Sequence, residues 1–115
     1  MDLKSLPAAL RKRRRYIIID IVSESERDLG EVVNTVWDSI LGFLGEIGTS
    51  RAGVWVVKDL FDQENQRFGV KVNHDYVEEI RAALALVNQI EGEKTNLRVL
   101  GVTGTMKSAR AKYFS

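Results

Sequence analysis

The sequence has no cysteine, one proline (Pro7) and one histidine (His74) in 115 residues. A chain without cysteine forms no disulfide and no thiolate metal site, which suits a reducing compartment, so we expect a cytoplasmic protein. One proline and no low-complexity segment leave no sign of a linker. Because 115 residues is the size of one ordinary domain, we expect a single domain over residues 1–115.

Long apolar runs are also missing. The basic stretch RKRRR (11–15) precedes the apolar run YIIIDIV, but that run is too short for a signal peptide and Asp20 interrupts it. No stretch approaches the ~20 apolar residues of a membrane-spanning helix. We therefore expect no membrane partner.

What the sequence does have is segregated charge. Its net charge of +1 hides two basic ends and an acidic middle. Residues 1–15 carry six basic side chains and one acidic one, and residues 98–115 carry four basic side chains and no acidic one. The residues between them carry seven basic and fifteen acidic side chains. Clustered bases of this kind are typical of a protein that binds a polyanion.

We therefore predict contacts with nucleic-acid phosphates at both ends of the chain, where each neutralised phosphate releases a counterion. One end is a basic N-terminal extension at 1–14, for which the sequence does not decide whether it contains a helix. The other is a basic terminal helix at 105–115. The residues predicted to contact these phosphates are Arg11, Lys12, Arg13, Arg14, Arg15, Lys107, Arg110 and Lys112.

Hydrophobic periodicity predicts the order of secondary structure. Four segments rich in β-branched residues, or alternating apolar with polar ones, predict strands at 15–23, 53–61, 67–73 and 96–103. Apolar residues at helical spacing predict helices at 29–47, 74–92 and 106–114. The order β-α-β-β-α-β plus a terminal helix predicts an α+β, ferredoxin-like (RRM-like) sandwich, in which two helices cover one face of a four-stranded antiparallel sheet.

Local signals suggest where the first two helices begin and end. Ser25 with Asp28, and Asp75 with Glu78, resemble capping boxes at helix starts. Gly48 and Gly92 are expected to end the same helices.

The stretch GVTGTMKS, Gly101 to Ser108, differs at one position from the phosphate-binding pattern G-x-x-x-x-G-K-[ST], because Met106 replaces the second glycine. A working phosphate loop joins the first strand of a β-α-β unit to a helix, whereas this stretch follows the last predicted strand. Met106 also places a side chain where the backbone must approach the phosphates. We therefore predict a strand end that leads into a basic helix, and no nucleotide site.

Other candidate catalytic groups are weak, and we predict no catalytic residue and no metal site. His74 stands at a strand-to-helix junction without a partner in catalytic spacing, and we expect a loop or capping residue. The valines of QRFGVKV make a poor base-stacking surface on the central strands. Two acidic groups could bind Mg²⁺ in a nuclease, although acids on turns are normally solvated. They are Glu24, Glu26 and Asp28, and Asp59, Asp62 and Glu64.

Glycines recur every third residue in LGFLGEIG, at Gly42, Gly45 and Gly48. They mark either a fraying helix end or a smooth stripe where another chain approaches, because glycine inside a helix costs about 1 kcal/mol against alanine. Aromatic residues are common anchors at contacts. We take Gly42, Phe43 and Gly45 as the candidate partner interface.

Two long stretches resemble one known family. GVWVVKDLFDQENQRFGVKVNHDYVEEIRAALALVNQIEG and RVLGVTGTMKSAR are similar to the archaeal ribonuclease P protein component 2 family, the counterpart of a eukaryotic ribonuclease P/MRP subunit. The resemblance runs from about Arg15 to Lys112. Its most specific parts are KVNHDYVEEIRAALALV and GVTGTMKSA.

The resemblance implies a non-catalytic subunit of ribonuclease P, which removes the 5′ leader of precursor tRNA. On this resemblance the RNA is the catalyst and needs Mg²⁺, the chain binds no cofactor, and precursor tRNA is met indirectly. The implied partners are ribonuclease P RNA and a barrel-fold ribonuclease P protein subunit, with which the chain can form a two-plus-two heterotetramer. The alternatives are a protein-interaction module with basic ends and a metal-dependent nuclease. The family supplies no short RNA-contact motif, so the predicted RNA-binding residues rest on charge.

Overall fold

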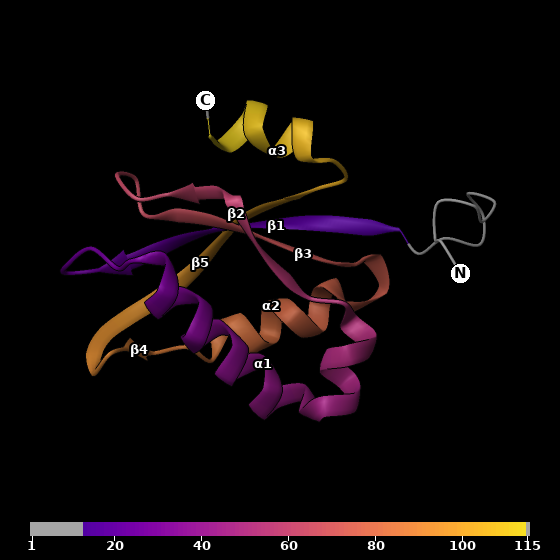
Figure 1. Cartoon of the computed structure of the whole chain (residues 1–115), viewed down its shortest axis with the longest axis horizontal. Helices are drawn as coiled ribbons and strands as arrows, with labels where there is room; N and C mark the ends of the chain where they lie inside the picture. Colours follow the sequence, from indigo (N-terminus) through magenta and orange to yellow (C-terminus); the bar gives the residue numbers. More distant parts are fainter. Residues whose placement is uncertain (1–12, 115) are drawn as a thin grey trace.

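The computed structural model describes residues 13–114, which form an antiparallel sheet and three α-helices. The strands lie in the order β2-β3-β1-β5-β4. The α+β class is confirmed, with five strands where four were expected. Along the chain the elements are β1 (Arg14–Ser23), α1 (Leu29–Ala52), β2 (Trp55–Asp62), β3 (Arg67–Asn73), the 3-10 turn η3 (His74–Tyr76), α2 (Val77–Ala85), β4 (Gln89–Ile90), β5 (Glu93–Thr103) and α3 (Met106–Tyr113) (Figure 1).

The helices lie on both sides of the sheet. Figure 1 shows α1 and α2 on one side and α3 on the other, and we call these two sides the α1/α2 face and the α3 face. Successive residues of a strand point to opposite faces. Accordingly, Ile17 and Ile19 of β1 pack in the large core under α1 and α2, whereas Ile18 packs in a smaller cluster with Ala109 of α3.

Helix α1 is longer than predicted and broken inside. Asp28 caps its start by accepting a hydrogen bond of 2.9 Å from the backbone N–H of Glu31, so the predicted Ser25 box is wrong. The helix does not end at Gly48. Gly45 has φ 73° and ψ 177°, which interrupts the helical backbone, and the chain resumes a helical course until Gly53 ends it in the left-handed region.

The predicted helix over 74–92 is the largest error. A 3-10 turn replaces its start, α2 ends at Ala85, and Tyr76 stands at the N-cap without a side-chain bond, so the Asp75 box is wrong too. Strand β4 then pairs with the start of β5. Glu91 and Gly92 both have positive φ, which a two-residue hairpin turn requires. The apolar stripe was misleading because Val87 and Ile90 stay buried after the helix has ended.

No helix within residues 13–114 is long and apolar enough to cross a membrane.

Candidate nucleic-acid interface

The N-terminal basic run is divided between the two faces of the sheet. Arg11 and Lys12 lie outside the described residues, and so does the segment for which an N-terminal helix was considered. Arg13 is exposed, and its carbonyl accepts a 2.9 Å bond from the backbone N–H of His74. Arg14 and Arg15 are half-buried and, as neighbours on β1, point to opposite faces. Arg14 shares the α3 face with Ile18, so the run does not form one continuous patch.

A buried amide holds Arg14 in place. The Arg14 guanidinium donates to the side-chain oxygen of Asn73. Asn73 is 4% exposed, and its Nδ2 donates to the carbonyl of Arg51 at 2.7 Å, near the end of α1. A Cβ on Gly53 would lie 3.0 Å from the Asn73 Nδ2, so glycine there leaves room for the amide. These contacts make Arg14 the most firmly positioned of the three arginines that the structure describes at this end.

The C-terminal basic residues lie on α3 as predicted, but on different sides of it. Thr105 caps the helix by accepting a 3.1 Å bond from the backbone N–H of Ser108. Lys107 and Arg110 line one surface hollow, and Arg110 reaches Asp59 of β2 at 3.8 Å. Lys112 is exposed and lies outside that hollow. Lys107 and Arg110 therefore face the β2 side of α3.

Two glycines leave room for side chains on the α3 face of the sheet. Gly69 of β3 and Gly101 of β5 are both paired with Ile18 of β1, so they flank it in one row. A Cβ on Gly101 would overlap the Tyr113 hydroxyl, and a Cβ on Gly69 would lie 2.6 Å from the side chain of Leu60. The first glycine of the near phosphate-loop motif thus makes room for a side chain of α3, and Thr105 within the motif caps the start of α3.

A charged row fixes the far end of α3. Arg67 donates from Nε to Asp20 at 2.8 Å and from NH1 to the carbonyl of Tyr113, also at 2.8 Å. Arg98 donates to the other oxygen of Asp20 at 3.0 Å, and its side chain is 67% exposed. Arg67 and Arg98 are basic residues of the α3 face that the predicted list omitted. For Arg67 the signal was the alternation of RFGVKVN, which puts Arg67 and Lys71 on the face opposite the valines.

The candidate partner interface lies on the α1 layer. Phe43 is 46% exposed, and Gly42 and Gly45 have open space where a side chain would stand. Leu41 and Ile47 nearby are 41% and 72% exposed. The glycines accompany a break in the helix, because Gly45 has the left-handed φ described above.

Three of the acidic residues considered as metal ligands, Asp28, Asp59 and Asp62, have structural roles. Within residues 13–114 no three His, Cys, Asp or Glu side chains gather as a metal site would require. Asp28 caps α1 and Asp59 pairs with Arg110. Asp62 accepts bonds from the side chain and backbone of Asn65, and these lower its pKa. His74 is exposed in the turn before α2.

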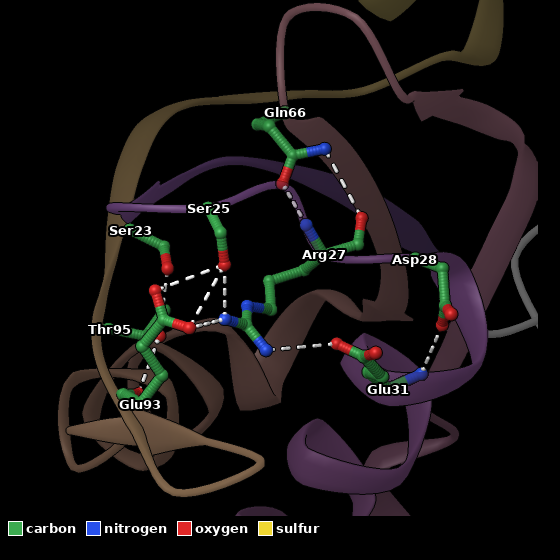
Figure 2. A network of polar contacts seen from close by, with 8 residues as sticks. All are labelled: Ser23, Ser25, Arg27, Asp28, Glu31, Gln66, Glu93 and Thr95. Carbon is green, nitrogen blue, oxygen red and sulfur yellow. Dashed lines mark hydrogen bonds and ion pairs between the residues drawn. The ribbon is translucent and has the colours of Figure 1, made fainter.

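The basic residue of the loop before α1, Arg27, forms ion pairs within the protein. Figure 2 shows the guanidinium of Arg27 between Glu93, at the start of β5, and Glu31 of α1. Arg27 is 6% exposed, and Gln66 bonds both its backbone N–H, at 2.7 Å, and its carbonyl. Desolvation by burial lowers the pKa of Arg27, but the bonds to Glu93 and Glu31 outweigh it and the pKa is raised. The network joins three turns and is not available to a ligand.

A similar fold occurs in a solved structure. A chain in a cryo-EM structure of yeast ribonuclease MRP superposes with a TM-score of 0.63 at 12% identity, over 82% of this chain and 76% of that one. This likeness shows a shared α+β fold. The model of the Rpp14/Pop5 family then matches residues 15–114, and the chain belongs to that family.

The two curated relatives described next match over 80% or more of their own length. Ribonuclease P protein component 2 of Pyrococcus abyssi is 38% identical over 115 residues, which is 100% of this chain and 96% of the relative. The protein of the same name from Methanocaldococcus jannaschii is 35% identical, over 96% of this chain and 80% of the relative. The resemblance to this family is therefore confirmed.

Proposed function

We propose that the chain is a non-catalytic protein subunit of ribonuclease P, the ribonucleoprotein that removes the 5′ leader of precursor tRNA, and that it binds and organises the catalytic RNA. Membership of the Rpp14/Pop5 family and the names of the curated relatives support the complex to which it belongs. The proposed RNA contact rests on basic residues from the two ends of the sequence that lie on one side of the sheet. Arg14 from one end of the sequence and the α3 residues from the other lie on the same side of the sheet.

The RNA surface consists of phosphate-contacting side chains held on ordered backbone. Phosphate contacts fix position and carry little sequence information, which suits a protein that supports the shape of an RNA. Arg14 is oriented by Asn73, and Lys107 and Arg110 by the docking of α3 on the sheet. The proposal also assigns phosphate contacts to Arg11, Lys12, Arg13 and Lys112, and to Arg15, whose side chain is on the other face of β1.

The protein partner belongs on the opposite side of the molecule. We assign Gly42, Phe43 and Gly45 on α1 to a barrel-fold ribonuclease P subunit, with the pair assembling as a two-plus-two heterotetramer. Exposed apolar side chains beside Phe43 support a protein contact there. In this arrangement RNA and partner bind together, precursor tRNA is met through the RNA, the RNA uses Mg²⁺, and the chain needs no cofactor in a cytoplasmic setting.

The strand order also supports the finer description of the fold. In the sheet the strands lie side by side in the order β2-β3-β1-β5, with α1 and α2 on one side, and this is the strand order of a ferredoxin-like sandwich. We propose this arrangement for the body of the protein, with β4 and α3 as additions.

Reconstituted cleavage of precursor tRNA tests the function. Ribonuclease P RNA and the barrel-fold partner are assayed at moderate Mg²⁺ with and without this chain, and with the variant carrying Lys107→Ala, Arg110→Ala and Lys112→Ala. We expect cleavage only with both proteins, and a higher Mg²⁺ requirement for the variant. If the chain binds the partner but leaves cleavage unchanged, it is an interaction module. If it cleaves RNA alone with Mg²⁺, and Asp62→Ala abolishes this, it is a nuclease.

A further inference from the structure

An exposed tryptophan stands on the same face as the basic residues. Trp55 begins the edge strand β2 and is 62% exposed. Trp55 is paired with Lys71 of β3, and Lys71 is paired with Tyr16 of β1. Residues directly paired across strands present their side chains on one face. We call Trp55, Lys71 and Tyr16 the Trp55 row.

The row belongs to the α3 face and lies at the border of α3. Val57, two residues after Trp55, packs in the small cluster under α3, and so does Tyr16. The next row of the sheet contains Gly69, Ile18 and Gly101, and it is the row that α3 covers. On the other side of Tyr16 along β1 stands Arg14, which Asn73 holds. Trp55 thus shares its face of the sheet with α3 and with the cations Lys71 and Arg14.

The neighbourhood of the indole is apolar at one edge and basic at the other. A hollow of about 510 Å³ is lined by Trp55 together with Val33 and Trp37 of α1. No acidic side chain belongs to the Trp55 row, and Asp59, which also lines the hollow, pairs with Arg110. A flat aromatic surface beside cations suits a nucleotide, whose base stacks while its phosphate is neutralised.

We propose that Trp55 stacks against one unpaired base of the bound RNA, and that Lys71 and Arg14 contact the phosphates beside that base. This inference rests on the proposed function and adds a site that binds a base. It also revises the expectation that the sheet lacks a stacking surface. That expectation considered the central strands, whereas the exposed indole stands on the edge strand, with Tyr16 two strands away in the same row.

Binding of a ten-nucleotide unstructured oligoribonucleotide to the whole chain tests the proposal. Trp55→Ala should weaken binding by about 5- to 150-fold, the range found for loss of one stacked base. It should leave the salt dependence unchanged, because no charge is lost. Lys71→Ala should instead reduce the slope of log affinity against log salt by about 0.7. Trp55→Phe should recover part of the affinity.

Phe43→Ala is the matched control, because it removes an exposed aromatic side chain from the α1 layer. It should bind the oligonucleotide as the unchanged protein does. In a Trp37→Phe background Trp55 is the one remaining tryptophan, and its fluorescence should be quenched by the oligonucleotide. An oligonucleotide of abasic riboses keeps the phosphates but offers no base, so it should bind the Trp55→Ala variant and the unchanged protein equally and quench nothing.

The outcomes separate this inference from the proposed function. If RNA binding depends on the α3 charges while Trp55→Ala binds normally and no quenching occurs, the function stands and the stacking site is wrong. If Trp55→Ala weakens binding of the barrel-fold protein and not of RNA, the surface contacts protein. If the unchanged protein binds neither the oligonucleotide nor ribonuclease P RNA, the proposed function fails, and the stacking site with it.

Discussion

The two faces of the sheet are covered differently, although β1 supplies isoleucines to both. On the α1/α2 face, Ile17 and Ile19 belong to a continuous core with side chains from two helices and all five strands. On the α3 face, the buried members of the cluster around Ile18 are Leu60 and Ala109. The rest of the α3 face carries the Arg67–Asp20–Arg98 row, Arg14 and the Trp55 row.

This difference separates stability from binding. Burial of apolar area is the main favourable term in folding, so the α1/α2 face holds the domain together. The α3 face has little apolar area to bury, and a helix docked there by a few contacts leaves charged and aromatic groups exposed beside it. Substitutions on the first face should therefore unfold the protein, whereas those on the second should release α3 or change binding.

The largest effect is expected from the core of the α1/α2 face. Phe68 of β3 is fully buried there. Phe68→Ala should reduce the free energy of unfolding by about 3–5 kcal/mol, because it removes buried area and leaves a cavity. That is a large share of the roughly 5–15 kcal/mol typical of a domain. Urea unfolding followed by circular dichroism measures it, and a loss below about 1 kcal/mol would contradict the assigned core.

A smaller effect is expected where α3 meets the sheet. Gly101→Val should displace the Tyr113 ring, which occupies the space of the new side chain. We expect a loss of about 1–3 kcal/mol and faster amide hydrogen exchange in α3, with exchange in α1 unchanged. Gly104→Ala is the control, because its Cβ would meet nothing within 4 Å. Equal acceleration in α1 and α3 would show that α3 does not separate from the rest of the fold.

Weakening the network around Arg27 should lower the stability of the whole domain, because the network joins the ends of elements that contribute to both faces of the sheet. The hydrogen bond from Ser25, followed by the bond from Arg27, lowers the pKa of Glu93. A lowered carboxyl pKa contributes stability above the pKa of the unfolded state, and that contribution disappears as pH falls through the folded-state value. Urea midpoints of the unchanged protein and Glu93→Gln should therefore differ at pH 7 and converge below about pH 4. A constant difference would contradict this ionisation.

Sequence patterns predicted secondary structure best where the spacing of apolar side chains fitted only one type of element. The alternation of RFGVKVN located β3 to the residue, and it also placed Arg67 and Lys71 on the face opposite the core. The pattern of 74–92 failed because buried positions at helical spacing continued through Val87 and Ile90 into a hairpin. A Glu-Gly pair in a two-residue turn was the signal that could have revealed it.

The site was harder to predict than the fold because charge in sequence does not determine a face. Consecutive arginines at 13–15 looked like one patch, yet a strand sends neighbours to opposite sides. Tryptophan is usually largely buried, so nothing in the sequence indicated that Trp55 lies on the surface, and its exposure depends on β2 being the edge strand. The position of α3 over the Gly69–Gly101 row depends on long-range packing that no local pattern encodes.

The smallest effect on stability is expected from removing the basic side chains of α3, which should change RNA binding alone. Replacing Lys107, Arg110 and Lys112 with alanine should leave the urea midpoint nearly unchanged and reduce the salt slope of RNA binding by about 2–3. Because Lys107 and Arg110 line one hollow on the β2 side of α3 and Lys112 lies outside it, changing those two should account for most of the reduction. Arg81→Ala, an exposed cation on α2, is the control and should leave the slope unchanged. If Arg81→Ala reduces the slope as much as Lys107→Ala does, RNA binding is a property of total charge, and the assignment to the α3 face is wrong.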